Sequence, residues 1–258
     1  MRTKWLWIVH ALTLMGVTLW AALDLRFEPL LRSLSRFVSD PQVTFQSTLD
    51  DSGTVRVVLL LLTLLLAASS LVALFVRLFH SAHFSRARSI ISLLAITTIV
   101  AVWCGVFINR SSLAWQGKRA RMAIQVDRLE TLAEPLRQRW PLRDGELPGV
   151  GPFMAYPFGR PTTLILLQSP LLAGDELCIA AVEGDEHGPI RFQLSGSSHD
   201  DWAEWHPDAS RPESFVGGLG DSHQIVTATK VGRQWYLVRY AAPEQRRSTE
   251  RRAEIASI

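Results

Sequence analysis

The stretch VVLLLLTLLLAASSLVALFV, residues 57–76, decides what kind of protein this chain can be. It runs for 20 residues without an aspartate, glutamate, lysine or arginine. At a rise of about 1.5 Å per residue, a helix of this length covers the roughly 30 Å of a bilayer's hydrocarbon core. A helix on the surface of a soluble protein keeps a polar face, which this stretch lacks. We therefore expect a transmembrane helix here.

Two further uncharged blocks lie on either side of it, at residues 5–23 and 90–108, each 19 residues long. Arg2 and Lys4 precede the first block, as basic residues precede the apolar core of a secretion signal. Such a core is only about 7–15 residues long and is followed by a small-residue cleavage pattern, which is missing after Leu23. The first block is therefore predicted to be a retained anchor, and residues 1–112 are predicted to form a transmembrane region with three spans.

Residues 25–38, between the first two spans, have the pattern of an amphipathic helix. Apolar residues recur every three or four positions while arginine and serine fall on the opposite side; the apolar set is Phe27, Leu30, Leu31, Leu34, Phe37 and Val38. The pattern predicts a short helix lying in the headgroup layer, with packing against the soluble part of the chain as the alternative.

His10 is the only histidine within the three predicted spans. An ionisable side chain inside a membrane can serve as a proton relay or a haem ligand. His10 lies only five residues from Trp5, close to the membrane surface, so we expect it to be uncharged and hydrogen-bonded in a structural role.

The formal net charge of +3 hides an uneven division along the chain. Residues 1–112 carry ten basic and five acidic side chains, net +5, whereas residues 113–258 carry 17 and 19, net −2. Arginine beside a span contacts anionic lipid, so the basic excess predicts a lipid bilayer as partner and no nucleic acid. Cys104 lies in the third predicted span and Cys178 in the distal half, so we expect no disulfide framework.

Basic residues near the spans give conflicting signals about membrane orientation. Five lie on the N-terminal side and eight on the other: Arg2, Lys4, Arg77, Arg86 and Arg88, against Arg26, Arg32, Arg36, Arg56, Arg110, Lys118, Arg119 and Arg121. The five are concentrated in a short leader and one short loop, and short segments count most in setting orientation. We therefore expect a multi-pass protein of the cell membrane with a cytoplasmic N-terminus and an extracytoplasmic C-terminal domain.

Residues 113–242 are predicted to form a soluble α+β domain, followed by a flexible tail at residues 243–258. A long helix is predicted to start near Ala114, because Trp115, Met122, Leu129 and Leu136 are seven residues apart. Pro135 interrupts this pattern, which favours a helix that covers its own sheet over a coiled coil between copies.

Beyond a connector rich in proline and glycine at residues 141–161, the apolar pattern changes to that of strands. Strands are predicted at residues 162–168, 176–182, 190–194, 224–230 and 234–240. Short glycine-containing loops join the second strand to the third and the fourth to the fifth. We therefore expect one long helix and an antiparallel sheet of five or six strands.

The stretch SSHDDWAEWHPD, residues 197–208, is the strongest candidate for chemistry. It lies in an acidic window, residues 175–221, whose 11 carboxylates and two arginines should attract cations. Imidazole and carboxylate are usual zinc ligands, which makes His199, Asp201 and His206 the candidate metal ligands. Neither a helical His-x-x-x-His pattern nor an EF-hand loop accompanies them.

The alternative reading of residues 197–208 is an acidic surface loop. In that reading Trp202 and Trp205 are buried against the sheet, while Asp200, Asp201 and Glu204 face water. The neighbouring GGLG and GDSH sequences, residues 217–220 and 220–223, lack the lysine of a phosphate-binding loop and the Gly-x-Ser-x-Gly of a nucleophile elbow. We therefore predict no catalytic residue and no cofactor.

Together these features predict an integral membrane protein that presents an extracytoplasmic α+β domain. The domain is expected to bind another protein or a second copy of the chain, or to sense an envelope component, and catalysis is not implied. One alternative is a membrane-tethered, metal-dependent hydrolase built around residues 197–208. A second is an accessory subunit of a transport complex, which would need other subunits because three spans with almost no charged lining make a poor pathway.

Overall fold

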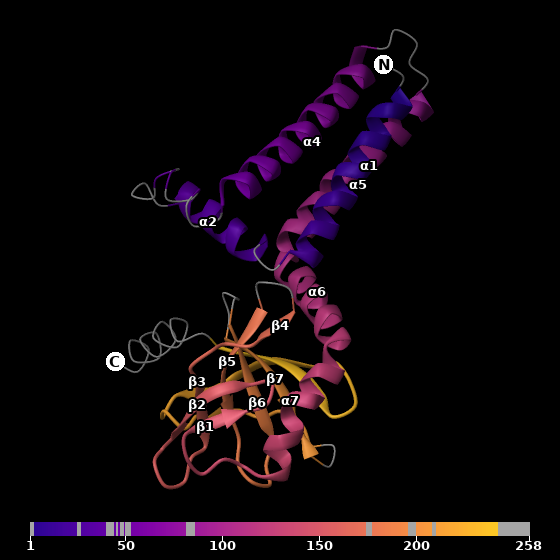
Figure 1. The fold of residues 1–258 in the computed structure, drawn as a ribbon. Coiled ribbons are helices and arrows are strands. Elements are labelled where there is room, and N and C mark those ends of the chain that lie inside the picture. The colour runs from indigo at the N-terminus through magenta and orange to yellow at the C-terminus, as the bar shows by residue number, and fades with distance from the viewer. Residues whose placement is uncertain are drawn as a thin grey trace, which may run out of the picture. The chain divides into compact units, whose positions relative to one another are not determined.

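A computed structural model of the chain describes residues 3–24, 27–39, 44, 46, 49, 53–80, 86–173, 177–195, 200–207 and 210–241. The chain divides into two compact units, Met1–Lys118 and Arg119–Ile258, which we call the helical unit and the sheet unit. Figure 1 shows the helices of the first and the sheet of the second. The predicted tail, residues 243–258, lies outside the described residues.

The helical unit is built from helices that follow the predicted spans. They are α1 (Thr3–Leu23), α2 (Phe27–Ser39), α4 (Thr54–His80), α5 (Arg86–Ile108) and the first part of α6 (Arg110–Ile124). Within the described residues, α1 and α4 are each long and apolar enough to cross a membrane. A third crossing results if α5 and α6, which form a bent pair, count as one span.

The predicted amphipathic segment forms helix α2, whose apolar side packs on α1 and α4. The buried cluster combines two residues from each helix: Val17 and Ala21, Phe27 and Leu30, Val57 and Leu60. Asp24, just after α1, accepts hydrogen bonds from Trp20 Nε1 at 2.7 Å and from Arg56 Nε at 3.1 Å. These bonds hold the end of α1 beside the start of α4.

Helix α6 leaves α5 at an angle of 65°, with Asn109 at the break. The side chain of Asn109 donates to the carbonyl of Gly105 at 2.9 Å and so caps the end of α5. Further along α6, Gly117 lies against the backbone of α1, because a Cβ at this position would fall 1.6 Å from the carbonyl oxygen of Ala22. Only glycine allows this approach.

The single long helix predicted from Ala114 is wrong, since the chain forms two helices. The break falls at Gln125, whose N–H bonds the carbonyl of Met122, three residues back, at 3.0 Å. Helix α7 (Val126–Gln138) then begins the part of the chain that covers the sheet. A seven-residue apolar repeat does not reveal a one-residue break, because residues on both sides of it keep the same spacing.

The sheet unit contains a nine-stranded antiparallel sheet in the order β1-β2-β3-β5-β6-β7-β11-β10, with β4 also paired to β5. The strands are β1 (Gly145–Leu147), β2 (Gly151–Tyr156), β3 (Thr163–Leu166), β4 (Leu171–Ala173), β5 (Leu177–Glu183), β6 (Ile190–Ser195), β7 (Asp200–Trp205), β10 (Ile225–Lys230) and β11 (Trp235–Tyr240). The five predicted strands correspond to β3, β5, β6, β10 and β11, and both predicted hairpins are antiparallel.

The sheet is larger than the predicted five or six strands. Strands β1 and β2 lie in the segment predicted to be a connector, and β7 lies in the stretch predicted to be an acidic loop. The first two are short and contain glycine or proline, which hides their alternation.

Helix α7 covers one face of the sheet, which we call the helix face. The indole of Trp235 donates to Glu130 Oε2 of α7 at 2.7 Å, and the guanidinium of Arg137 lies 4.8 Å above the ring of Trp205. The buried side chains of α7 are Leu129, Leu132, Ala133 and Leu136. The prediction that this helix covers its own sheet is therefore confirmed for α7.

A two-stranded ribbon covers part of the opposite face, which we call the ribbon face. The ribbon comprises residues 210–223 and contains β8 (Phe215–Val216) paired with β9 (Ser222–His223). Beneath it Trp202, Val238 and Tyr240 form a buried cluster, against which Phe215 packs.

The two outer strands of the sheet are poor templates for further pairing. Strand β1 has only three residues. Strand β10 carries an irregularity between Ile225 and Thr227 and ends in Lys230, and both a bulge and an edge lysine discourage another strand from pairing.

Candidate functional site

Residues 200–205 of the candidate segment form the inner strand β7, which pairs with β6 on one side and β11 on the other. Successive side chains of a strand point to opposite faces. Asp200, Trp202 and Glu204 therefore belong to the ribbon face, and Asp201 and Trp205 to the helix face. The prediction of an acidic loop with its carboxylates in water is wrong, because Asp201 and Glu204 are fully buried.

The three candidate metal ligands have different surroundings. Asp201 is paired with Arg239 of β11, whose Nε and Nη2 donate to its two oxygens at 2.7 and 3.1 Å. His206 follows β7 and lies 2.8 Å from Glu204 Oε2 through Nε2 and 3.1 Å from Ser210 Oγ through Nδ1. His199 lies outside the described residues. Across the described part of the chain, no three histidine, cysteine, aspartate or glutamate side chains are grouped so that they could hold a metal ion.

Glu204 is the centre of a buried polar network on the ribbon face. Besides His206, it accepts a hydrogen bond from the hydroxyl of Tyr240 at 2.5 Å, and Arg191 Nε lies 3.8 Å from its Oε2. Burial and the charge of Glu204 raise the pKa of the Tyr240 hydroxyl, which keeps it protonated as a donor. The network joins β6, β7 and β11 to the start of the ribbon.

A second buried pair joins Asp200 of β7 to His223 at the end of the ribbon. Nδ1 of His223 lies 2.7 Å from Asp200 Oδ2, and the indole of Trp202 donates to Asp200 Oδ1 at 2.6 Å. Burial alone would raise the pKa of Asp200, but the hydrogen bonds from His223 and Trp202 outweigh it and lower that pKa below its ordinary value. Asp200 is therefore held as a carboxylate.

Glu183 of β5 lies under the glycine turn of the ribbon. Its Oε1 accepts long hydrogen bonds from Gly218 N at 3.3 Å and Thr163 Oγ1 at 3.4 Å. A Cβ on Gly217 would come within 2.6 Å of the same oxygen, so the turn approaches this closely because it lacks a side chain. Burial raises the pKa of Glu183, although its electrostatic interaction with His223 and its hydrogen bond from Gly218 work against this rise.

Asp200 orients His223 as it would orient a general base, but a substrate has no access to the imidazole. Asp200 holds Nδ1 of the imidazole, and Nε2 has no hydrogen-bond partner among the described residues. However, His223 is only 4% exposed, and Phe215 stacks on its ring at 4.6 Å. A substrate cannot reach Nε2 in this arrangement, so the contacts of His223 serve to hold the ribbon on the sheet.

Sequence reasoning missed most of this network. One signal was present, since Asp200, Glu204 and His206 recur at intervals of two or four, as polar residues on one face of a strand do. No local pattern identifies Tyr240 and His223 as their partners, because the sheet brings these residues together from distant segments.

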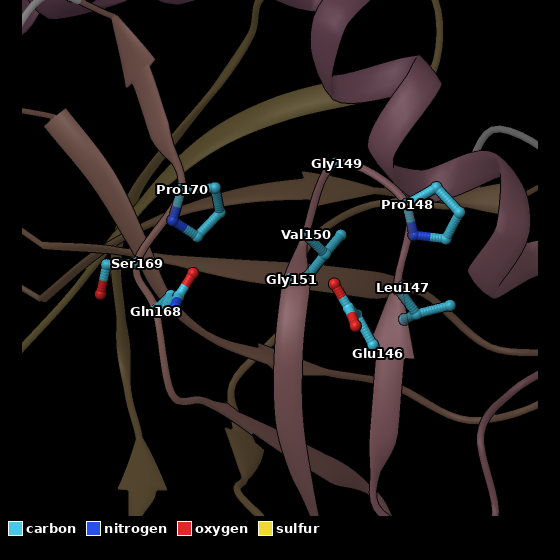
Figure 2. Close-up of a pocket in the computed structure, with 9 residues that line it drawn as sticks. All are labelled: Glu146, Leu147, Pro148, Gly149, Val150, Gly151, Gln168, Ser169 and Pro170. Carbon is cyan, nitrogen blue, oxygen red and sulfur yellow. The ribbon is translucent and has the colours of Figure 1, made fainter.

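A groove of about 580 Å³ lies at one end of the sheet unit. Figure 2 shows its two walls, the turn between β1 and β2 and the segment at residues 168–170, on either side of the start of β2. Gly149 and Gly151 have φ of +75° and +92°, which favours glycine in this turn. Glu146, Gln168 and Ser169 supply the polar side chains of the lining.

Exposed apolar side chains lie on β2 beyond the groove and on the residue that precedes Gln168. Met154 and Tyr156 of β2 are 49% and 45% exposed, and Leu167 is 60% exposed. Leu167 bonds the carbonyl of Pro152 at 2.9 Å and directly precedes Gln168 of the groove. We call Met154, Tyr156 and Leu167 the open patch.

In the helical unit, His10 joins three helices through hydrogen bonds. Trp103 of α5 donates from Nε1 to His10 Nε2 at 2.8 Å, so in the neutral ring the proton is on Nδ1, which lies 3.0 Å from Ser70 Oγ of α4. The hydroxyl of Ser70 donates in turn to the carbonyl of Ala67 at 2.8 Å. These contacts correspond to the hydrogen-bonded structural role that the sequence predicts for His10.

Comparisons with known protein families, with curated proteins and with solved structures found no match to this chain.

Proposed function

We propose that this chain is an integral membrane protein whose helical unit anchors the sheet unit, and that the sheet unit binds a protein partner. The observation that carries the binding proposal is the open patch beside the groove. Clustered exposed apolar side chains mark interaction surfaces more often than isolated ones do. Here they lie next to a groove that offers a carboxylate, an amide and a hydroxyl.

The helical unit supports the membrane part of the proposal through the side chains that it leaves exposed. Leu12, Met15, Leu62 and Leu65 of α1 and α4 are between 55% and 67% exposed. Leaving such side chains in water forgoes about 1.5–3 kcal/mol for each one that burial would gain. Lipid removes that cost.

The open patch and the groove together have the composition of an interface. Its apolar part is Met154, Tyr156 and Leu167, and its polar part is Glu146, Gln168 and Ser169 of the groove, which can hydrogen-bond to a partner. Protein interfaces commonly combine an apolar centre with a polar rim.

The proposed binding site can be tested by photo-crosslinking in native membranes. A photoreactive amino acid is placed at Met154 or Leu167 in the full chain, and at exposed Glu186 as the matched control. We expect the same discrete adduct from the two patch positions and none from Glu186. The absence of adducts, or an identical set from all three positions, would contradict the proposal. An adduct of twice the chain's mass would identify the partner as a second copy.

We further propose that the sheet unit is extracytoplasmic and the N-terminus cytoplasmic. The concentration of basic residues in the leader and in the short loop between the second and third predicted spans supports this orientation. Protease added outside sealed, right-side-out vesicles should remove a C-terminal tag. Full protection of the tag in vesicles of verified orientation would reverse the assignment.

A further inference from the structure

Side chains, and not backbone pairing, hold the ribbon on the sheet. Its strands β8 and β9 form a separate two-stranded sheet, and none of the described backbone hydrogen bonds joins residues 210–223 to the large sheet. The polar contacts lie at the ends and at the turn of the ribbon: His206 with Ser210, His223 with Asp200, and Gly218 with Glu183. A segment held in this way can open while the sheet stays folded.

Glu183 is a buried carboxyl group beneath the turn of the ribbon, residues 217–220. It is 7% exposed, and both of its described hydrogen bonds reach Oε1. They are long, 3.3 Å from Gly218 N and 3.4 Å from Thr163 Oγ1, whereas good hydrogen bonds of these kinds are no longer than about 3.2 and 3.0 Å. A buried carboxylate needs strong hydrogen bonds or a paired cation, so this site suits the neutral acid better.

The basic side chains that face Glu183 are engaged elsewhere. Arg191 of β6 is directly opposite Glu183, but its Nε lies 3.8 Å from Oε2 of Glu204 on the next strand. His223 of the ribbon lies 2.7 Å from Asp200 through Nδ1. Neither of them forms a described hydrogen bond or ion pair with Glu183.

Ionisation of Glu183 is therefore coupled to the position of the turn. Burial raises the pKa of Glu183, and its interactions with His223, Gly218, Arg191 and Thr163 lower that pKa by less. Opening the turn admits water to the carboxyl group and returns its pKa toward the ordinary value of 4.5. The preference for the closed ribbon is therefore complete below that ordinary value and is lost as the pH rises through the raised value.

We propose that the ribbon is a pH-dependent strap whose turn is released from the sheet when Glu183 ionises. This inference does not depend on the proposed partner. The turn lies on Thr163, because a Cβ on Gly218 would overlap its Oγ1. Thr163 is directly opposite Tyr156 of the open patch, so release of the turn extends the exposed surface beside that patch.

Hydrogen exchange of the full chain in detergent micelles, measured at a series of pH values from 5 to 8, tests the strap. Labelling times are scaled so that the chemical exchange of a free amide is the same at each pH. We expect the scaled exchange of residues 215–222 to rise with pH, by up to tenfold for each unit by which closure raises the pKa of Glu183. Residues 190–195 and 200–205 of the sheet should stay protected. An equal rise in these strands would mean unfolding of the whole unit and would overturn the proposal.

Glu183→Gln should remove most of this rise, and the matched change Glu186→Gln, at an exposed position of the next turn, should leave it as in the wild-type chain. Asp200 stays ionised throughout the series, because its ordinary pKa of 3.8 is lowered further. His206 and His223 are present in every variant. An equal rise in the wild-type chain and in Glu183→Gln would assign the effect to these histidines and not to Glu183. The absence of any rise in the wild-type chain would also overturn the proposal.

Thr163→Val gives a second test if Glu183→Gln does not fold. It removes a hydrogen bond that lowers the pKa of Glu183, so the pH at which exchange in residues 215–222 rises should move upward. An unchanged or lower midpoint would contradict the strap.

Discussion

Three carboxylates of β7, two on the ribbon face and one on the helix face, each pair with a different basic side chain. Asp200 pairs with His223, Asp201 with Arg239 and Glu204 with His206. Taking such groups out of water is costly, and removing one partner leaves the other buried and uncompensated. The pairs therefore make β7 the strand where single substitutions should have the largest effect.

Replacing Asp201 with Asn should strongly destabilise the sheet unit. The change leaves Arg239, whose side chain is 12% exposed, without the carboxylate that accepts two of its hydrogen bonds. Breaking a buried pair costs about 3–5 kcal/mol, so we expect a loss near the lower limit because Arg239 is not fully buried. Thermal unfolding followed by tryptophan fluorescence measures the loss. The same change at exposed Asp221 should have little effect, and comparable losses at the two sites would contradict this account.

Acid should destabilise the sheet unit through Asp200. Its pKa is lowered in the folded chain, so its stabilising contribution is complete above the ordinary value of 3.8 and is lost as the pH falls through the folded value. The melting temperature of the wild-type chain should therefore drop below about pH 4. In Asp200→Asn the drop should be smaller, and an unchanged acid profile in this variant would count against the assignment.

Ionisation of Glu183 should have the opposite effect on stability from ionisation of Asp200. Burial raises its pKa above the ordinary value of 4.5, so ionising it costs stability as the pH rises through the folded value. Glu183→Gln removes this cost and should be more stable, relative to the wild-type chain, at neutral pH than at acid pH. The same melting experiment checks the prediction, and a relative gain in acid instead would contradict it.

At the scale of elements, the ribbon is held on the sheet by aromatic contacts as well as by its histidines. Phe215 stacks on His223, meets Trp202 and Tyr240 edge-on, and lies 4.1 Å below the guanidinium of Arg191. Phe215→Ala should cost about 3 kcal/mol and increase hydrogen exchange in residues 210–223 before the rest of the sheet unfolds. Val216→Ala is the matched control, because the neighbouring Val216 is 71% exposed. A similar increase in exchange in both variants would show that Phe215 does not hold the ribbon.

Two adjacent serines of α4 allow a matched test of the His10 network. Ser70 is buried and bonds His10, whereas the hydroxyl of exposed Ser69 donates to the carbonyl of Leu66 in its own helix. Hydrogen bonds between helices in lipid contribute about 0.6–2 kcal/mol. Ser70→Ala should therefore lower the stability of the helical unit by about 1 kcal/mol, and Ser69→Ala by less, in a denaturation series in mixed micelles. Equal effects would argue against a contribution from His10.

The long elements were predictable because their signal is regular over many residues. Uncharged blocks identified α1, α4 and α5, and alternation or short apolar runs identified five strands. Strand β7 was missed because three carboxylates in five residues are typical of a loop. Their burial depends on Arg239, His223 and Tyr240, whose positions opposite β7 follow only from the complete sheet.

At the scale of the whole molecule, the predicted boundary after residue 112 lies close to the boundary between the two units, after Lys118. Apolar composition separates the two units without knowledge of any contact. The groove, in contrast, needs the turn at residues 148–150 to face Gln168, and nothing in either segment alone indicates the other.

A substitution at Gly117 should disturb the packing of α6 on α1. Because a Cβ there would overlap the carbonyl of Ala22, Gly117→Ala must displace α6 from α1 and should cost at least about 1–3 kcal/mol. Gly105→Ala is the control, since a Cβ at Gly105 meets nothing within 4 Å, and alanine in a helix should be neutral or stabilising. Limited proteolysis within residues 118–125 and thermal stability in detergent measure the difference. If both variants behave like the wild-type chain, α6 does not depend on this contact.

The irregular outer strand β10 should prevent neighbouring copies of the protein from pairing through their sheets. Copies of a protein confined to a bilayer share one plane and collide far more often, and in fewer orientations, than copies dissolved in three dimensions. A flat, regular outer strand could then pair with the outer strand of a neighbouring copy, and the sheets would join edge to edge into filaments. The irregularity between Ile225 and Thr227 and the ammonium group of Lys230 interrupt that growth, so under the proposed membrane anchoring we expect the protein to remain dispersed even at high density.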